Sequence, residues 1–200
     1  MRTKIFNSAV ERLKEIVVSW NTCDVYLVGG CVRDLLLDTE IKDIDLCIDM
    51  KDGANEFIKF IKKSWSSCCK NFATYPTYGT SKFTLILDKK REIEIECVMP
   101  RTETYNNGPR KPDEVKFTSI KEDAMRRDFC CNALYKNVID GNILDPTGFG
   151  LADIKNKILR TPLDPEQTFI DDPLRMLRAI RFAYQKGFMI LPEVMQKIKP

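Results

Sequence analysis

The alternation of apolar and polar positions along the chain predicts helices and strands in mixed order. Apolar residues recur with helical spacing from Ile5 to Trp20, where Glu and Lys fill many of the positions between them. From Ile44 to Ile48 they alternate with polar residues, as in a strand with one buried face. Similar patterns predict strands at 25–28, 83–87, 92–98, 134–139 and 142–144, and helices at 32–37, 54–63, 151–157 and after Asp172. The expected fold class is therefore α+β, with a small mixed sheet backed by helices.

Turn and capping residues divide these elements. Asp140-Gly141 predicts a tight hairpin, and Ser119 followed by Glu122 is the pattern of a capping box. Asp172-Pro173 offers an acidic N-cap and a proline at the first helical position. The polar stretch from Thr102 to Val115 predicts a loop. Prolines between Leu159 and Phe169 indicate a domain boundary there.

Composition narrows the class of protein. The 200 residues are 44% hydrophobic and 30% charged, which is typical of a globular protein with a sizeable core. The net charge of +3 fits an RNA-binding protein but does not distinguish one. With 8 Cys, no His and no CxxC spacing, zinc-finger and His-based metal sites are excluded. We expect reduced, mostly buried cysteines and a cytoplasmic location, since no apolar stretch has the length of a signal peptide or a membrane span.

Two motifs near the N-terminus carry chemistry. Gly29-Gly30 follows a predicted strand, and two glycines there let backbone N–H groups approach a phosphate at the start of a helix. Asp43 and Asp45 are two apart on the next strand, so both carboxylates project from one face. Such a pair can hold the two divalent ions that bridge a nucleoside triphosphate and activate a 3′ hydroxyl. Either motif alone suits a turn and an acidic edge strand, but their order and spacing together indicate nucleotidyl transfer.

These residues open a longer series of motifs. The segment Leu27–Leu36 with Asp43–Leu46 resembles the opening motif of the class II tRNA nucleotidyltransferase and bacterial poly(A) polymerase family. The resemblance continues, in family order, through Arg101–Tyr105, Glu122–Leu134, Asp145-Pro146 and Asp171–Ala183. It implies a polymerase-beta-like nucleotidyltransferase head over residues 1–160. Residues 161–200 would begin an all-helical neck that carries the base-recognition helix.

The resemblance implies the catalytic residues. Asp43 and Asp45 match the carboxylates that bind two Mg²⁺ ions. Glu96 is the candidate third acid. Glu92, Glu94 and Glu96 share one face of a strand, so spacing alone does not choose among them. Position relative to Arg101 favours Glu96.

The resemblance also implies the nucleotide-binding residues. An Arg–Asp pair can distinguish ribose from deoxyribose, because the 2′ hydroxyl is both donor and acceptor. A second such pair can imitate a Watson–Crick partner for C and A without a template. Further arginines at steps of three on the same helix would reach the triphosphate. The matching residues are Gly29, Gly30 and Arg33 for the phosphates, Arg127 and Asp128 for the sugar, Asp172 and Arg175 for the base, and Arg178 and Arg181 for the triphosphate.

The implied activity is addition of CCA to the 3′ end of tRNA from CTP and ATP, with release of pyrophosphate. The stretch Tyr78–Phe83 lacks the paired basic residues that poly(A) polymerases of this group usually carry. The segment from Arg101 to Phe117, with Arg110 and Lys111, resembles the mobile loop that CCA-adding enzymes use when they switch from C to A. Both points favour CCA addition over polyadenylation. Partial CC or A addition, transfer to a protein or small molecule, and a catalytically silent RNA- or nucleotide-binding module stay open.

The chain departs from the family pattern in three places. Asp171 stands where the family usually has Glu, and Cys130-Cys131 replaces Thr-Ile, which we expect to alter packing and leave the chemistry intact. Related enzymes continue into helical domains that grip tRNA, whereas this chain stops at Pro200. We therefore expect tRNA gripping to need further C-terminal domains or a protein partner.

Overall fold

The computed structural model describes residues 2–105, 108 and 112–198, and the chain divides into two compact units. The first, called the sheet unit below, comprises residues 1–100 and 135–144. The second, called the helical unit, comprises residues 101–134 and 145–200. Each unit is thus built from two separate stretches of the chain.

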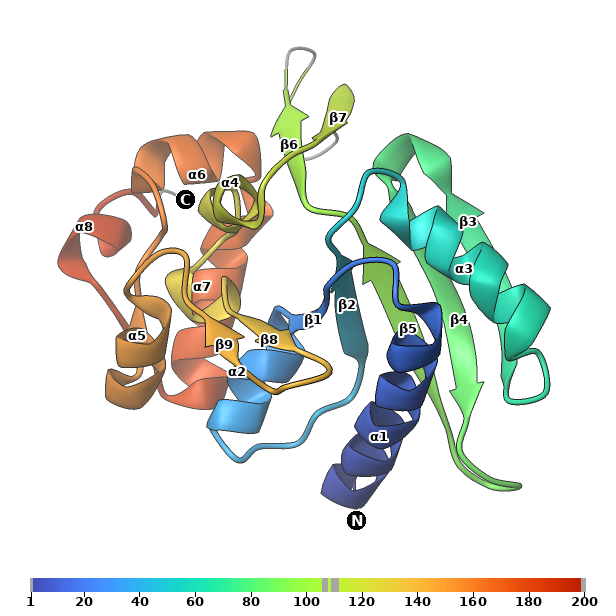
Figure 1. Ribbon diagram of the computed structural model, residues 1–200. Coiled ribbons are helices and arrows are strands. Elements are labelled where there is room, and N and C mark those ends of the chain that lie inside the picture. The colour runs from blue at the N-terminus through green and yellow to red at the C-terminus, as the bar shows by residue number, and fades with distance from the viewer. Residues whose placement is uncertain (1, 106–107, 109–111, 199–200) are drawn as a thin grey trace. The chain divides into compact units, whose positions relative to one another are not determined.

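The sheet unit contains a seven-stranded mixed sheet (Figure 1). Its strands lie in the order β3-β4-β5-β2-β1-β8-β9, in which β2 and β5 are parallel and the other neighbours antiparallel. The strands are β1 (Val25–Val28), β2 (Ile44–Ile48), β3 (Cys69–Tyr75), β4 (Thr80–Ile86), β5 (Glu92–Val98), β8 (Tyr135–Asn137) and β9 (Ile143–Leu144). The other elements of this unit are α1 (Arg2–Trp20), α2 (Gly30–Leu36), α3 (Gly53–Ser64) and the 3-10 turn η1 (Pro76–Tyr78).

Helices α1 and α3 lie on the same face of this sheet (Figure 1). The apolar stripe of α1 is fully buried at Leu13 and Ile16. The ring of Trp20 packs against that of Phe57 on α3, with 4.8 Å between the ring centroids. Burial of one such side chain contributes about 1.5–3 kcal/mol. The polar positions of β2 and β5 are therefore left on the opposite face of the sheet.

The helical unit consists of short elements around an aromatic contact. Phe129 packs edge-on against Phe182, with ring centroids 5.8 Å apart, which joins the start of the η2 turn to helix α7. Its elements are β6 (Arg101–Thr104), β7 (Glu114–Phe117), α4 (Ile120–Met125), η2 (Cys130–Asn132), α5 (Gly150–Asn156), β10 (Ile158–Leu159), α6 (Pro165–Asp171), α7 (Leu174–Lys186), β11 (Met189–Ile190) and α8 (Pro192–Met195). Strands β6 and β7 form an antiparallel hairpin, and β10 and β11 a short parallel pair.

The elements predicted from the sequence are present, with ends displaced by a few residues. The capping box is confirmed: the Glu122 backbone N–H donates to the Ser119 hydroxyl at 3.3 Å, and the Ser119 N–H donates to the Glu122 carboxylate at 3.2 Å. Asp172 accepts a hydrogen bond from the Leu174 N–H at 3.0 Å, but it is not the N-cap that was predicted: α7 begins at Leu174, and Pro173 occupies the N-cap position.

One local prediction was wrong, and one strand of the large sheet was missed. The segment Thr102–Val115 was expected to be a loop, but both of its ends belong to the β6–β7 hairpin. Strand β6 carries polar residues on both faces, and β7 alternates over four residues only, with Val115 and Phe117 as its apolar positions. Strand β3 was missed because a bulge between Lys70 and Ala73 interrupts its pattern. Arg110 and Lys111 lie outside the described residues.

All eight cysteines are free thiols, and six of them are buried. Cys130 and Cys131 are among the buried ones, as expected for residues that fill a core position. Within the part of the chain that the structure describes, no helix is long and apolar enough to cross a membrane. The division into a head of residues 1–160 and a neck of 161–200 stays a prediction.

Candidate functional site

The sheet unit carries acidic side chains on the face opposite α3. Asp45 on β2 pairs in parallel register with Glu96 on β5. Residues paired across neighbouring strands project from the same face, and the adjacent pair of Ile44 and Ile95 is fully buried on the other face. Asp43 directly precedes β2 and is exposed, as is Glu96, whereas Asp45 is half-buried. The register therefore brings Glu96 beside Asp45.

The two other glutamates of β5 have basic partners. Glu92 forms an ion pair with Lys70 at 2.7 Å, and Glu94 with Lys82 at 3.4 Å. The strand register thus separates Glu96 from the two residues that spacing left equivalent. Its role as a third catalytic acid stays a prediction.

Two buried thiols lie beside these acids. Burial, and then the Asp45 carboxylate, raise the pKa of Cys31 to about 12. Burial, and then Glu96 and Asp45, also raise the pKa of Cys97. Both thiols are therefore neutral near pH 7, and the carboxylates carry the local charge. Within the described residues, no three Cys, Asp or Glu side chains gather into a complete metal-ligand set.

The predicted phosphate element is the turn from β1 into α2. Gly29 has φ of 69° and ψ of −135°, a conformation that other residues rarely adopt. A Cβ at Gly30 would lie 3.5 Å from Arg33 Nη2, an ordinary contact, so only Gly29 is required by its conformation. Arg33 is buried and makes two hydrogen bonds of 3.0 Å with the Asp34 carboxylate. Its guanidinium is therefore held close to Gly30 by the ion pair with Asp34.

In the helical unit, most of the predicted nucleotide-reading residues surround one cavity. The cavity measures about 210 Å³, and its lining residues are Arg126, Arg127, Asp128, Asp172, Arg175 and Arg178. We call it the reading cavity. Five of the six residues that the sequence assigned to the sugar, base and triphosphate line it. Arg181 does not; its side chain is exposed and lies over the Phe182 ring at 5.5 Å.

Asp128 is anchored by three groups. One carboxylate oxygen accepts from the Phe129 N–H at 2.8 Å and from Asn132 Nδ2 at 2.9 Å. The other oxygen accepts from Arg178 Nε at 2.7 Å and lies 2.6 Å from its Nη2. The ionic partner of Asp128 is therefore Arg178 on α7, whereas Arg127 pairs elsewhere.

Arg175 is buried and held by backbone carbonyls. Its Nη2 donates to the carbonyl of Arg126 at 2.9 Å, and its Nη1 donates to that of Thr168 at 3.3 Å. These bonds use two of the five N–H donors of a guanidinium and fix its plane. Arg175, the predicted base-recognition residue, is thereby tied to the turn that carries Arg127 and Asp128.

Sequence reasoning missed the acid behind this turn. Asp123 is fully buried and accepts hydrogen bonds from the side chains of both Arg126 and Arg127. Acids three and four residues before an arginine on a helix face that arginine, so the spacing was a usable signal. Glu103 on β6 also pairs with Arg126, at 3.1 Å.

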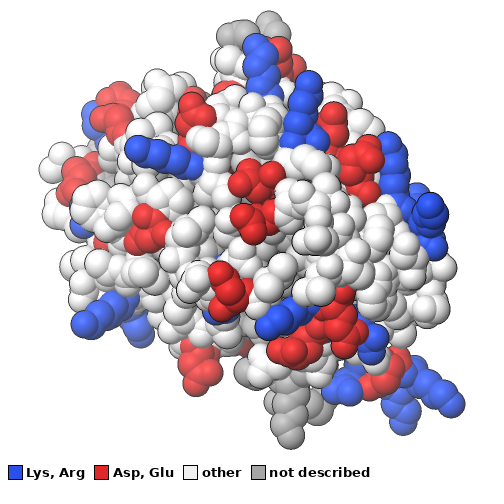
Figure 2. Space-filling model, in the orientation of Figure 1, with Lys and Arg blue, Asp and Glu red and all other residues white. Residues whose placement is uncertain are grey.

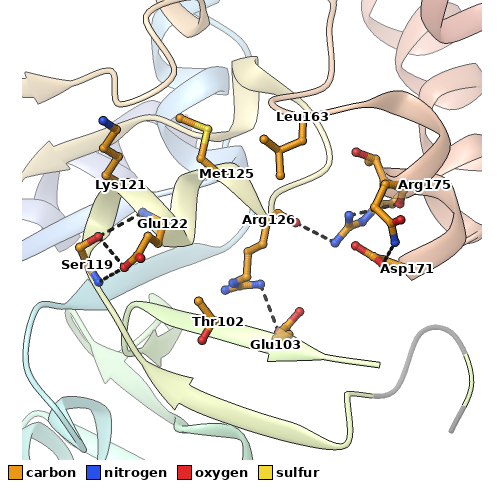
Figure 3. Close-up of a pocket in the computed structure, with 12 residues that line it drawn as sticks. Thr102, Glu103, Ser119, Lys121, Glu122, Met125, Arg126, Leu163, Asp171 and Arg175 are labelled. Atoms are coloured by element: carbon orange, nitrogen blue, oxygen red, sulfur yellow. Dashed lines mark hydrogen bonds and ion pairs between the residues drawn. The ribbon is translucent and has the colours of Figure 1, made fainter. Parts of the chain in front are cut away.

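A larger cavity of about 670 Å³ adjoins Arg126 and Arg175 (Figure 3). Figure 3 shows Arg126 extending toward Glu103 while its backbone faces Arg175. The remaining wall comes from β6, α4, α6 and the segment before α6, with Met125 and Leu163 as apolar members. On the face shown in Figure 2, basic and acidic side chains are interspersed, so the net positive charge is not gathered there in one basic patch.

Comparison with known proteins gives consistent matches. Residues 25–160 match the family model described as the poly(A) polymerase head domain. The mitochondrial CCA tRNA nucleotidyltransferase of Saccharomyces cerevisiae is 36% identical over 193 residues. A solved CCA-adding enzyme in an apo form superposes with a TM-score of 0.77 at 31% identity, and covers 99% of this chain. A tRNA nucleotidyltransferase complexed with a primer tRNA and an incoming ATP analog gives 0.71 at 31% identity, over 92% of this chain.

These similar proteins are longer. The matched region covers 86% of this chain but 33% of the yeast protein. It covers 44% and 48% of the two solved chains. The chain thus spans a third to a half of the length of the proteins it matches, and it shares its fold with the matched part of the solved chains.

Proposed function

The chain belongs to the family of the poly(A) polymerase head domain, and on that premise we propose that it transfers nucleotides from CTP and ATP to the 3′ end of tRNA to build the CCA terminus, with release of pyrophosphate. The observation that carries the proposal is the reading cavity. Five residues that come from two separate stretches of the sequence, and that the family motifs assign to the nucleotide, line one cavity. Asp43 and Asp45 at β2 would supply the metal-binding carboxylates that the reaction also needs.

The acid pair suits magnesium. Mg²⁺ prefers oxygen ligands and is usually bound by one or two carboxylates together with substrate phosphates. Asp43 and Asp45 offer such donors, Glu96 lies in register beside Asp45, and the neighbouring thiols are neutral. Asp43 and Asp45 would hold the two ions. When bound, Mg²⁺ would neutralise triphosphate charge and lower the pKa of the attacking 3′ hydroxyl.

The five assigned side chains of the reading cavity then have separate roles. Arg127 and Asp128 bind the ribose hydroxyls, and Asp128 is held for this by Arg178. Arg175 and Asp172 bind the edge of the base. Because Arg175 is fixed by two carbonyls, its remaining donors have one orientation, which supports selection of a base without a template.

Arg178 and Arg181 differ in their proposed contributions. Arg178 lines the cavity and can balance charge on the triphosphate while it holds Asp128. Arg181 lies outside the lining, so its proposed contact with the triphosphate depends on the long exposed side chain. No histidine is available for proton transfer, and carboxylates, water or metal-bound groups would serve instead.

CCA addition is favoured over polyadenylation by the relatives. The yeast protein is named a CCA tRNA nucleotidyltransferase, and one solved neighbour is a CCA-adding enzyme. Tyr78–Phe83 lacks the paired basic residues of poly(A) polymerases. We also propose a cytoplasmic location.

The test is incorporation of labelled CTP and ATP, each alone and both together, into a tRNA transcript that lacks its 3′ CCA. We expect two C and one A in that order, and then arrest. The double variant Asp43→Ala/Asp45→Ala should lose activity by at least about a thousandfold, since both metal ligands are removed. Glu92→Gln is the matched control, because Glu92 is an exposed acid paired with Lys70 on the same sheet.

Other results would change the assignment. A ladder of A alone would indicate a poly(A) polymerase, and addition that stops at C or requires a preformed CC end would indicate a partial enzyme. Full activity of the double variant would contradict the role of the acid pair. Binding of ATP without any incorporation would support the silent nucleotide-binding module.

A further inference from the structure

We propose that Asp123 is a positioning residue, whose buried carboxylate holds Arg127 toward the reading cavity and thereby sets the preference for ribose over deoxyribose. The inference rests on the proposed function, because it assigns the support of the sugar-reading side chain. Asp123 itself lies outside the lining of the cavity.

The geometry around Asp123 is two-sided. One carboxylate oxygen accepts from Arg126 Nε at 3.0 Å and Nη2 at 2.6 Å, and from the Arg101 backbone N–H at 3.1 Å. The other accepts from Arg127 Nε at 3.3 Å and Nη2 at 3.0 Å. Each oxygen thus binds the guanidinium of a different arginine, and the carboxylate is fully buried. The Asp123 carboxylate therefore holds the side chains of both Arg126 and Arg127.

Charge explains why the acid is needed. Four arginines line the reading cavity, against two aspartates. Adjacent guanidinium groups repel, and a long arginine side chain gains rotamer freedom when it turns toward water. A buried carboxylate with two charge-assisted hydrogen bonds to Arg127 opposes both effects. Without it, Arg127 would lose its fixed place, and a displacement of about 1 Å in a positioned group can cost about a hundredfold in rate.

The neighbouring groups have separate anchors, which makes the effect selective. Asp128 is held by Arg178, Asn132 and a backbone N–H. Arg175 is bound to the backbone carbonyl of Arg126, which remains when the side chain of Arg126 is released. A change at Asp123 should therefore disturb the reading of the sugar while the choice between C and A persists.

The experiment compares CTP with dCTP, and ATP with dATP, as substrates for wild type and Asp123→Asn. We expect the ribose preference in kcat/KM to fall by about tenfold or more, because the two charge-assisted bonds to Arg127 are lost. The order of C and A addition should persist. Glu122→Gln is the matched control: it removes the adjacent exposed carboxylate and keeps an amide that can close the capping box, so the ribose preference should stay as in wild type.

A second variant tests the inference if the Asp123→Asn protein does not fold. Arg127→Lys keeps the charge but replaces the two-pronged contact with Asp123 by a single point of attachment. It should lower the ribose preference to a similar degree. An unchanged preference in a folded Asp123→Asn protein, or in Arg127→Lys, would overturn the inference. A wild-type chain that incorporates no nucleotide would remove the proposed function itself, and the inference with it.

Discussion

At the level of single residues, the Asp128 carboxylate depends on one partner from a distant part of the sequence. Arg178 contacts it with two nitrogen atoms at 2.6 and 2.7 Å, and Asp128 is buried. Arg178→Ala would leave this carboxylate without its cation. We expect the free energy of unfolding to fall by about 1–3 kcal/mol. This is less than the loss for a fully buried ion pair, because Arg178 is itself partly exposed.

Chemical denaturation of Arg178→Ala and Arg181→Ala side by side measures this loss. Arg181 lies on the same helix, is exposed and stacks near the Phe182 ring, so its removal should cost at most about 0.5 kcal/mol. Equal losses in the two variants would mean that the Asp128 pair contributes no more than an exposed arginine does.

Glu103 makes a second prediction at this scale, on the pH dependence of stability. Burial alone would raise its pKa, but Arg126, the Tyr105 hydroxyl and Arg101 outweigh burial and hold the pKa below the ordinary value of 4.5. A carboxylate with a lowered pKa in the folded state stabilises the fold above its unfolded pKa, and this contribution is lost as the pH falls through the folded value. Glu103→Gln should thus be less stable than wild type at pH 7.

Urea unfolding between pH 7 and about 3 tests this. The difference between wild type and Glu103→Gln should shrink once the pH falls below about 4.5. Glu114→Gln, on the exposed partner strand β7, is the control and should differ little from wild type at any pH. If the difference in stability between wild type and Glu103→Gln stayed constant over this pH range, the charge of Glu103 would not be the cause of the lost stability.

The motifs identified the residues of the reading cavity but not their partners. Arg127 and Asp128 are neighbours in the sequence, and the natural expectation is that they act as one pair. In the structure Arg127 binds Asp123, one helical turn earlier, while Asp128 binds Arg178, which arrives 50 positions later on α7. Helical spacing could have predicted the first partner. The second depends on how α7 packs, which no local pattern contains.

At the level of elements, the close approach of α5 to η2 requires a glycine. A Cβ at Gly150 would lie 2.6 Å from the carbonyl oxygen of Cys130 and 2.8 Å from Leu134 Cδ2. Helix propensity alone would make Gly150→Ala stabilising by about 1 kcal/mol. Because the nearest atom belongs to the backbone, we expect the opposite sign, a loss of about 1–3 kcal/mol.

Thermal and urea unfolding of Gly150→Ala decide the sign. Ala152→Ser, on the exposed side of the same helix, should stay within about 0.5 kcal/mol of wild type. A stabilised Gly150→Ala protein would mean that α5 and η2 move apart at little cost, and that their packing does not require a glycine.

Elements were predictable where one face is buried. Strand β5 alternates cleanly because one side of the sheet is covered by helices, and its register with β2 places Glu96 and Asp45 on the other side. Strand β3 and the β6–β7 hairpin were not recognised. Strand β3 contains a bulge at the edge of the sheet, and β6 has polar residues on both faces, so hydrogen bonding rather than apolar burial defines these strands.

At the level of the whole molecule, the compact units cut across the predicted head and neck. Residues 101–134 belong to the same unit as 145–200, because α6 and α7 contact the turn that carries Arg126 and Asp128. The Phe129–Phe182 contact joins the same two regions. A chain cut after residue 160 would lose these partners while the sheet unit keeps all of its strands.

The last prediction follows from that arrangement and tests where the domain boundary lies. In a variant that ends at residue 160, hydrogen exchange should become fast in the 120–134 segment, whose buried Asp128 and Phe129 lose Arg178 and Phe182. Exchange in β1, β2, β4 and β5 should stay slow, because their hydrogen-bond partners lie within the sheet unit. Equal protection of 120–134 in the full chain and the shortened one would instead place an independent domain at 1–160, as the sequence predicts, with α6 and α7 as additions to it.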